Sequence, residues 1–200
     1  MVGIRSLFSR NSTETAALNV HDQVYTEKSS SDGVITAGVK DMIVVENSGQ
    51  YHCFDTVSSV TRYPEFLSLY ENVVVLEDQG MNELGESVKI VRYNIHVPLI
   101  FSAFLRELHY TLRLVTKVGP EESYMKWTQV DGPSFVKENV GHWTSRQVGP
   151  NVELGLEMEL GYKFYLPSHL KNYIQSTILR DTLASIKKRA QDTQTSFKPF

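Results

Sequence analysis

The sequence contains a single cysteine, Cys53, among its 200 residues. One thiol excludes an internal disulfide and a cysteine-based zinc site. We expect Cys53 to be inert and buried, because a free cysteine behaves as a small hydrophobe. The six histidines lack ligand spacing, and the motif His-Glu-x-x-His does not occur. The sequence therefore predicts no metal site and no cofactor.

No apolar run approaches the ~20 residues that a membrane-spanning helix needs. The first residues also lack the apolar stretch of a secretory signal, so we expect a cytoplasmic protein. Arg5 and Arg10, with no acidic residue before Asn11, leave organelle targeting by the leader as the alternative. The net charge of −3 favours no nucleic-acid partner and at most transient membrane contact. The oligomeric state is not defined by the sequence.

Signatures of catalysis are also missing. The chain has neither a Gly-x-Ser-x-Gly nucleophile elbow nor a glycine-rich phosphate loop. Glu153, Glu157 and Glu159 share the polar face of one predicted strand, so we interpret them as solvated side chains. No residue is therefore predicted to be catalytic.

What the sequence does contain is a pattern of strands and helices. Residues 1–33 are rich in Ser, Thr, Asn and Asp and predict a flexible leader, and residues 193–200 predict a tail. Between them, residues 34–192 predict one domain. It opens with a strand and two short helices, the second beginning near Pro64, and most of the following strands come before residue 148. Asp78-Gln79-Gly80 predicts a turn between two of them.

The clearest pattern lies between Val152 and Phe164, where apolar residues occupy every second position. This period of two predicts one long strand with a dry and a wet face. A helix from Pro167 to about Arg189 follows, with an apolar stripe that must be covered. We therefore predict an α+β fold, in which a curved antiparallel sheet of about six to seven strands surrounds a long C-terminal helix, with two short helices after the first strand.

Several segments match a known family. They are Tyr63-Pro64-Glu65-Phe66, Asp131-Gly132-Pro133-Ser134-Phe135, Trp143, and the helix from Leu170 that closes with Lys187-Lys188-Arg189-Ala190. From about residue 36 to 190 the chain resembles START-related helix-grip proteins, in the branch of polyketide cyclases/dehydrases and coenzyme Q-binding proteins. The resemblance implies a cavity between the long helix and the sheet that accommodates sterols, lipids, quinones or polyketides.

The leading hypothesis is therefore a binder or carrier of a hydrophobic small molecule, such as a lipid or polyprenyl quinone. Ligand would enter near residues 63–67 and the turn at 131–135. Arg92 and Gln129 are the candidate polar anchors, with Arg92 serving as one only if the face that it shares with Val88 and Ile90 is internal, and solvated if that face is external. The predicted cavity lining consists of Tyr63, Phe66, Tyr93, Tyr110, Trp127, Trp143, Leu156, Met158, Leu160, Tyr162, Leu170, Ile174 and Ile178.

Two other functions remain open from the sequence. A cyclase or dehydratase acting on a polyketide-like substrate would need an acid/base group in the pocket. An inward-facing histidine or carboxylate would favour it. A regulatory or protein-interaction domain would instead combine a filled interior with an exposed apolar patch.

Overall fold

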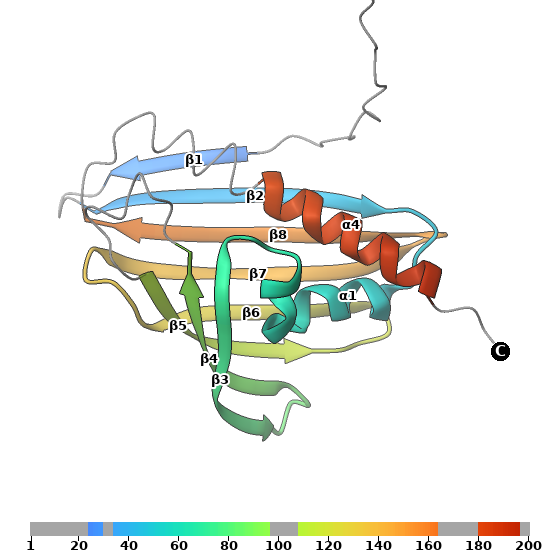
Figure 1. The fold of residues 1–200 in the computed structure, drawn as a ribbon, viewed down its shortest axis with the longest axis horizontal. Helices are drawn as coiled ribbons and strands as arrows, with labels where there is room; N and C mark the ends of the chain where they lie inside the picture. The colour runs from blue at the N-terminus through green and yellow to red at the C-terminus, as the bar shows by residue number, and fades with distance from the viewer. Residues whose placement is uncertain (1–23, 30–33, 97–107, 164–179, 197–200) are drawn as a thin grey trace, which may run out of the picture.

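The computed structural model of the chain describes residues 24–29, 34–96, 108–163 and 180–196. They form one eight-stranded antiparallel sheet with helices beside it (Figure 1). In chain order the elements are β1 (Val24–Ser29), β2 (Ile35–Val45), α1 (Gln50–Ser58), the 3₁₀ helix η1 (Val60–Glu65), β3 (Tyr70–Met81), β4 (Ser87–Ile95), β5 (Leu108–Lys117), β6 (Glu122–Asp131), β7 (Val136–Val148), β8 (Asn151–Tyr162) and α4 (Arg180–Ser196).

The predicted α+β architecture is confirmed, but the sheet has one strand more than expected. Its order is β1-β2-β8-β7-β6-β5-β4-β3. The additional strand is β1, which pairs with β2 and lies in the segment that the sequence assigned to the leader. Val24, Tyr25 and Thr26 favour a strand. Because this run is short and its neighbours are polar, the sequence alone does not predict the strand. The two short helices consequently follow β2, the second strand.

Strand β8 lies near the middle of the sheet and explains the alternating sequence. It pairs with β2 from Val45↔Val152 to Ile35↔Tyr162, and with β7 on its other edge. Its even-numbered residues face the helices; Val152, Leu154 and Leu156 are buried, whereas Glu157 and Glu159 are exposed. The period of two in the sequence thus reports a strand that is dry on one face only.

The predicted turn at 78–80 is wrong. Strand β3 continues to Met81, and the register shifts at Asp78/Gly80, where Gly80 has a φ of 73°. A glycine with positive φ favours a β-bulge as well as a turn, so the local signal was ambiguous. The chain reverses instead at residues 82–86, where Asn82 Oδ1 accepts hydrogen bonds from the backbone N–H groups of Leu84 and Glu86.

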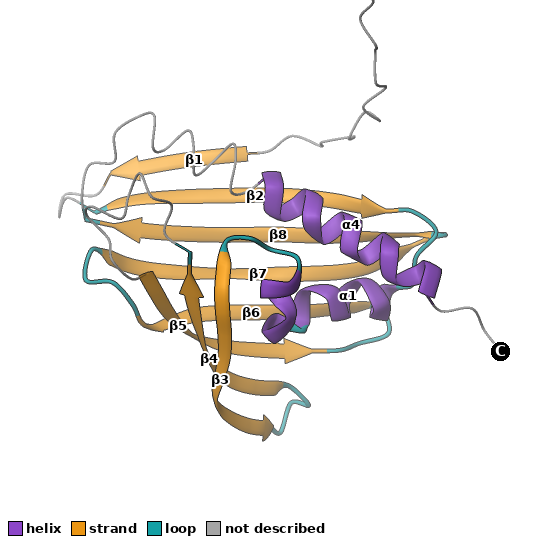
Figure 2. Cartoon of the chain, viewed as in Figure 1, coloured by secondary structure: helices purple, strands orange, loops and turns teal. Residues whose placement is uncertain are grey.

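All the described helices cover one face of the sheet (Figure 2). Helix α1 contacts β6, β7 and β8, and α4 contacts β2 and α1. The β3–β4 hairpin runs across the direction of β2 and β8 in Figure 1, so the sheet curves around the helices. We call the helix-covered, concave side of the sheet the inner face.

The C-terminal helix differs from its predicted bounds at the end that the structure describes. It continues past Arg189 to Ser196, into the segment predicted as a tail, and residues 167–179 of the predicted helix lie outside the described residues. Leu183, Ile186 and Ala190 join the buried core together with Phe54 and Val57 of α1. The amphipathic stripe is therefore used for packing on the sheet, as the pattern indicated.

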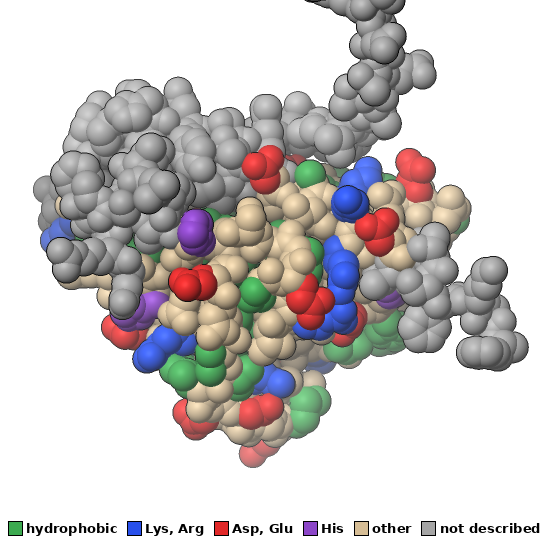
Figure 3. All heavy atoms as spheres, in the orientation of Figure 1, with side chains coloured by type: hydrophobic (Ala, Val, Ile, Leu, Met, Phe, Trp, Pro, Cys, Tyr) green, Lys and Arg blue, Asp and Glu red, His purple; other side chains and the backbone are tan. Residues whose placement is uncertain are grey.

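The surface seen on the helix side carries no large patch of one charge. Figure 3 shows acidic and basic side chains interspersed over the described part of this face. None of the described helices is both long and apolar enough to cross a lipid bilayer.

Candidate functional site

A polar network closes the inner face at the end where α1 begins. Gln50 Nε2 donates to Gly119 O at 3.1 Å and to Ser123 Oγ at 3.3 Å. The backbone N–H of Gln50 donates to Gln147 Oε1 at 2.9 Å, and Ser145 Oγ–H donates to Gln50 O at 3.3 Å. Because these buried groups find partners within the protein, this end of the inner face is structural.

Contacts from α4 hold the neighbouring helices in place. His52 Nε2 lies 3.0 Å from Ala190 O. Arg189 Nη2 donates to Glu65 Oε2 at 2.9 Å, and its guanidinium lies 5.6 Å from the centre of the Phe66 ring. The helices α1, η1 and α4 therefore form one layer over the sheet. Phe66, predicted to line a cavity, packs in this layer beneath Arg189.

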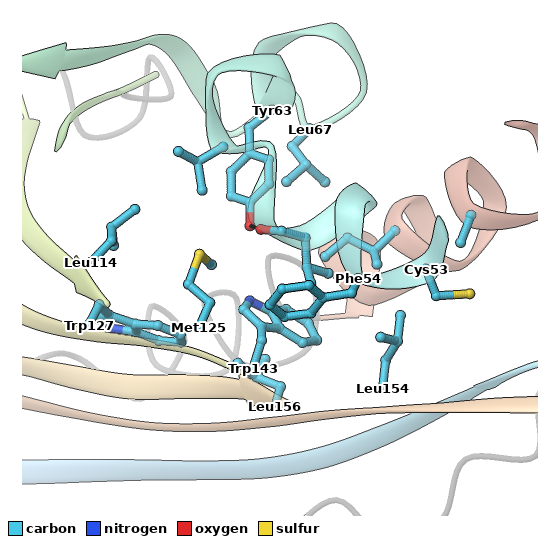
Figure 4. Packing of buried hydrophobic residues seen from close by; sticks show 14 of the residues in the cluster. Cys53, Phe54, Tyr63, Leu67, Leu114, Met125, Trp127, Trp143, Leu154 and Leu156 are labelled. Atoms are coloured by element: carbon cyan, nitrogen blue, oxygen red, sulfur yellow. Dashed lines mark hydrogen bonds between the residues drawn. The ribbon is translucent and has the colours of Figure 1, made fainter. Parts of the chain in front are cut away.

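Beneath α1 the interior is a packed core. Figure 4 shows Phe54 of α1 above Trp143, with Leu154 and Leu156 of β8 beside it. Trp143 and Leu156 are each only 5% exposed, and Cys53, the lone thiol, is fully buried. Burial raises the pKa of the Cys53 thiol, which contacts Ser48 Oγ at 2.9 Å. Two predicted cavity residues, Trp143 and Leu156, therefore belong to this core.

Farther along the inner face, the Trp127 indole lies over Gly141 of the neighbouring strand. A Cβ at position 141 would come 2.4 Å from Trp127 Cζ2 and 2.8 Å from Met158 Cβ. Trp127 Nε1 donates to Asn139 Oδ1 at 3.0 Å, which fixes the ring. The missing side chain at Gly141 thus leaves room for a large aromatic ring to lie flat on the sheet.

Beyond Trp127 the inner face carries a cluster of tyrosines. The ring centres of Tyr63 and Tyr70 are 5.4 Å apart, and those of Tyr70 and Tyr93 are 5.6 Å apart. Tyr110 is the direct register partner of Tyr93 across the β4–β5 ladder. Such tilted aromatic contacts pack the rings closely.

The hydroxyl groups of this cluster differ in their partners. Tyr63 O–H donates to Val57 O at 2.5 Å, so the Tyr63 ring is tied into the core. Within the part of the chain that the structure describes, no hydrogen bond satisfies the hydroxyls of Tyr70, Tyr93 or Tyr110. Burial raises the pKa of Tyr70 and of Tyr110 to about 12, and that of Tyr93 well above its ordinary value. These phenols are therefore neutral donors at physiological pH.

Gln129 lies next to this cluster. It is in phase on β6 with the buried Met125 and Trp127, so its side chain is on the inner face. A Cβ at Gly132 would lie 2.8 Å from Gln129 Nε2 and 3.3 Å from Tyr110 Cδ1, so both side chains border the same glycine. Gln129 Oε1 is shielded from solvent and has no hydrogen-bond partner among the described residues. We call Tyr70, Tyr93, Tyr110 and Gln129 the tyrosine–glutamine site.

The remaining predicted site residues differ in their burial and in the face of the sheet on which they lie. Met158 packs against the edge of the core, Leu160 is half-buried and Tyr162 is buried, all on the inner side of β8. Arg92, predicted as a polar anchor, is exposed and in register with Val74, on the face opposite to Tyr93. The alternation of a strand puts neighbours on opposite faces, so Arg92 is solvated. Leu170, Ile174 and Ile178 lie outside the described residues.

One inner-face residue, Asp41, is not predicted from the sequence. Asp41 is in phase with Val39 and Val45 on β2 and is only 7% exposed. Its Oδ1 accepts a hydrogen bond from the N–H of Met42 at 2.7 Å. The only available signal was its position between apolar residues of a predicted strand. The inner face therefore carries one buried carboxylate on β2 in addition to its aromatic side chains.

Solved structures share this architecture. No protein-family model matches the sequence, and no curated protein has significant sequence similarity to it. Human StAR-related lipid transfer protein 5 is 9% identical, with a TM-score of 0.62, covering 85% of this chain and 88% of that chain. A STAR-related lipid transfer protein fragment from Xanthomonas axonopodis is 10% identical, with a TM-score of 0.59 and coverage of 84% and 98%. The Zhui aromatase/cyclase from a Streptomyces species is 16% identical, with a TM-score of 0.57 and coverage of 78% and 94%.

Identities this low establish the fold alone. The chain has the helix-grip fold of START-related lipid transfer proteins and polyketide aromatase/cyclases, and the resemblance predicted from its sequence is confirmed at that level.

Proposed function

We propose that this protein binds and carries a hydrophobic small molecule, such as a lipid or polyprenyl quinone, on the inner face between the sheet and the C-terminal helix. The observation that supports the proposal best is the tyrosine–glutamine site. Ligand sites typically combine apolar surface with a few polar groups that lack partners. A bound ligand covers the apolar surface and forms hydrogen bonds with the polar groups. Gln129 Oε1 is the shielded atom of this site, and a purely structural core seldom leaves such an atom without a partner.

The two lipid transfer proteins with the same fold support this proposal by analogy. The physical requirement is modest. Apolar burial contributes about 25 cal/mol per Å², so a ligand that buries ~400 Å² gains about 10 kcal/mol before the cost of association. That cost is at least ~4 kcal/mol, which leaves a micromolar to millimolar affinity from apolar burial and more with hydrogen bonds.

Tryptophan fluorescence provides the test. The chain has two tryptophans, Trp127 and Trp143, and both lie on the inner face. We expect a conjugated polyene fatty acid, which accepts energy from tryptophan, to quench their emission saturably at about one molecule per chain. Replacement of Tyr93 by Ala removes apolar contact area and should weaken this binding. Replacement of the exposed Tyr51, on the outer side of α1, should leave it unchanged. Linear, unsaturable quenching that is equal in all three proteins would contradict the proposal.

The cyclase or dehydratase function is the second candidate, and Asp41 is the observation that favours it. A buried carboxylate on the inner face is the kind of group that transfers protons in an apolar site. Under this alternative, a poly-β-ketone thioester mimic would be converted by the protein, and Asp41→Asn would abolish conversion while leaving polyene binding intact. Absence of conversion by the unaltered protein, with binding retained, favours the carrier.

The protein-interaction alternative also has one observation in its favour. Four large apolar side chains of β3 and the following turn are exposed by 40–69%, namely Val74, Leu76, Met81 and Leu84. Acidic residues Glu77, Asp78 and Glu83 accompany them. This surface is compatible with a carrier, and its existence alone does not distinguish the two functions.

A further inference from the structure

The side-chain amide of Gln129 is the most unusual polar group of the inner face. Its Oε1 atom is shielded from solvent and has no hydrogen-bond partner among the described residues. Native proteins satisfy nearly all buried polar atoms, so a buried amide oxygen without a partner requires an explanation. A ligand group that pairs with the amide supplies one.

An amide places a specific demand on that ligand group. Its oxygen only accepts hydrogen bonds, and its nitrogen only donates them. The oxygen is the shielded end of the Gln129 amide, so the group that pairs with it must be a hydrogen-bond donor. A hydroxyl group supplies this donor and also accepts hydrogen bonds from its neighbours. An ether, ester or ketone oxygen accepts only, and it leaves Gln129 Oε1 unsatisfied.

The adjacent tyrosine makes the same chemistry available on a second side. Tyr110 and Gln129 border the same glycine, Gly132. Tyr93 is opposite Tyr110 in the β4–β5 register, and Tyr70 contacts Tyr93. A phenol hydroxyl donates to the ligand oxygen while the amide oxygen accepts the ligand proton. A single ligand hydroxyl between them would therefore complete a hydrogen-bonded chain inside an apolar surface.

On these grounds we propose that the ligand is an alcohol or phenol, an apolar molecule with a free hydroxyl group at its polar end, and that Gln129 and Tyr110 bind this hydroxyl. The inference rests on the proposed function, since it names the class of molecule that the same site would carry. The inference predicts that the protein discriminates between an alcohol and its methyl ether. The two molecules have nearly the same apolar surface, but only the alcohol has a hydrogen-bond donor.

The test compares matched pairs on the full-length protein. The probes are hexadecanol, a sterol and a polyprenyl hydroquinone, each beside its methyl ether, with affinity measured by displacement of the polyene fatty acid and by native mass spectrometry. For a pair that fits the interior, we expect the dissociation constant of the alcohol to be at least about tenfold lower than that of its ether. The ether leaves a buried hydrogen-bond acceptor unpaired, and such a loss usually costs about this much affinity. The unaltered protein alone thus decides whether the hydroxyl is recognised.

Variants locate the recognition. Gln129→Leu keeps a similar side-chain volume and removes the amide, so the preference should fall to within about twofold while ether binding is retained. Gln79→Leu makes the same chemical change at an exposed position of β3 and should keep the full preference. If Gln129→Leu fails to fold, Gln129→Met provides the same test.

The outcomes separate this inference from the proposed function. Equal binding of alcohol and ether by the unaltered protein overturns the inference and leaves the carrier function standing. A preference that persists in Gln129→Leu overturns the assignment to Gln129. Absence of binding by every alcohol, every ether and the polyene overturns both.

Discussion

The indole ring of Trp127 on β6 lies directly on the backbone of Gly141 on β7. The two residues are register partners in the β6–β7 ladder, and a Cβ at position 141 would meet Trp127 Cζ2 at 2.4 Å and Glu157 O at 2.6 Å. The second of these atoms belongs to the backbone of β8, which cannot move without disturbing the sheet. The absence of a side chain at Gly141 is therefore what permits the central aromatic packing of the inner face.

Gly141→Ala should destabilise the protein by about 1–3 kcal/mol, the usual cost of forcing extra volume into a packed interior. Urea denaturation followed by tryptophan fluorescence measures this directly. Gly49→Ala is the matched control, because nothing lies within 4 Å of a Cβ at position 49. Equal unfolding free energies for the two variants would contradict the close contact between Trp127 and Gly141.

The tyrosine cluster predicts an alkaline transition. Burial raises the pKa of Tyr70 and Tyr110 to about 12, and those of Tyr63 and Tyr93 are raised well above the ordinary value. A group whose pKa is raised by folding contributes stability that is fully present below its unfolded pKa of about 10. That stability is lost as the pH rises through the folded pKa, so the stability of the protein should fall between about pH 10 and 12.

Ultraviolet absorbance of tyrosinate checks this prediction. The chain has 10 tyrosines, and we expect a late-titrating group that appears together with unfolding. Tyr110→Phe should reduce the amplitude of that late phase. A single phase near pH 10 that releases all the tyrosine protons while the protein stays folded would show that the cluster is solvated.

The attachment of α4 to the rest of the fold should depend on apolar packing more than on its ion pair. Ile186 is 1% exposed within the core, and Ile186→Ala should cost about 2–5 kcal/mol. The Arg189 and Glu65 side chains are 29% and 51% exposed, and a solvated pair of this kind contributes at most about 1 kcal/mol. Arg189→Gln should therefore be several-fold milder in chemical denaturation. The reverse ranking would mean that the charge contact, with the Phe66 ring beneath it, holds the helix.

How far the sequence predicted this molecule depends on the range of the interactions involved. The strand at β8 and the amphipathic C-terminal helix are visible in the sequence because their side-chain periods are local and regular. Strand β1 was not predicted, because its short apolar run is surrounded by polar residues and its formation depends on pairing with β2. Gly80 favours a turn and a bulge equally, and only the neighbouring strand β4 decides between them.

Less of the candidate site than of the fold could be predicted from the sequence. Strand phase put Gln129 on the same side as Trp127. It left open whether Arg92 is internal or solvated, because phase within one strand does not identify which face is the inner one, and the structure places Arg92 on the outer face. The structural network of Gln50 could not be predicted from the sequence, because its partners, Ser123 and Ser145, are 73 and 95 residues away. Asp41 was missed because an aspartate in a strand is usually solvated, and only the register of β2 beneath the helices makes it buried.

The most direct test of the central claim is native mass spectrometry of the full-length protein after gentle purification, followed by organic extraction of whatever is released. We predict an apolar molecule with a free hydroxyl group, near one per chain, which dissociates more readily from Gln129→Leu than from Gln79→Leu. An empty protein that also takes up no member of a panel of lipids, alcohols and quinones would contradict the claim that the inner face is a binding site.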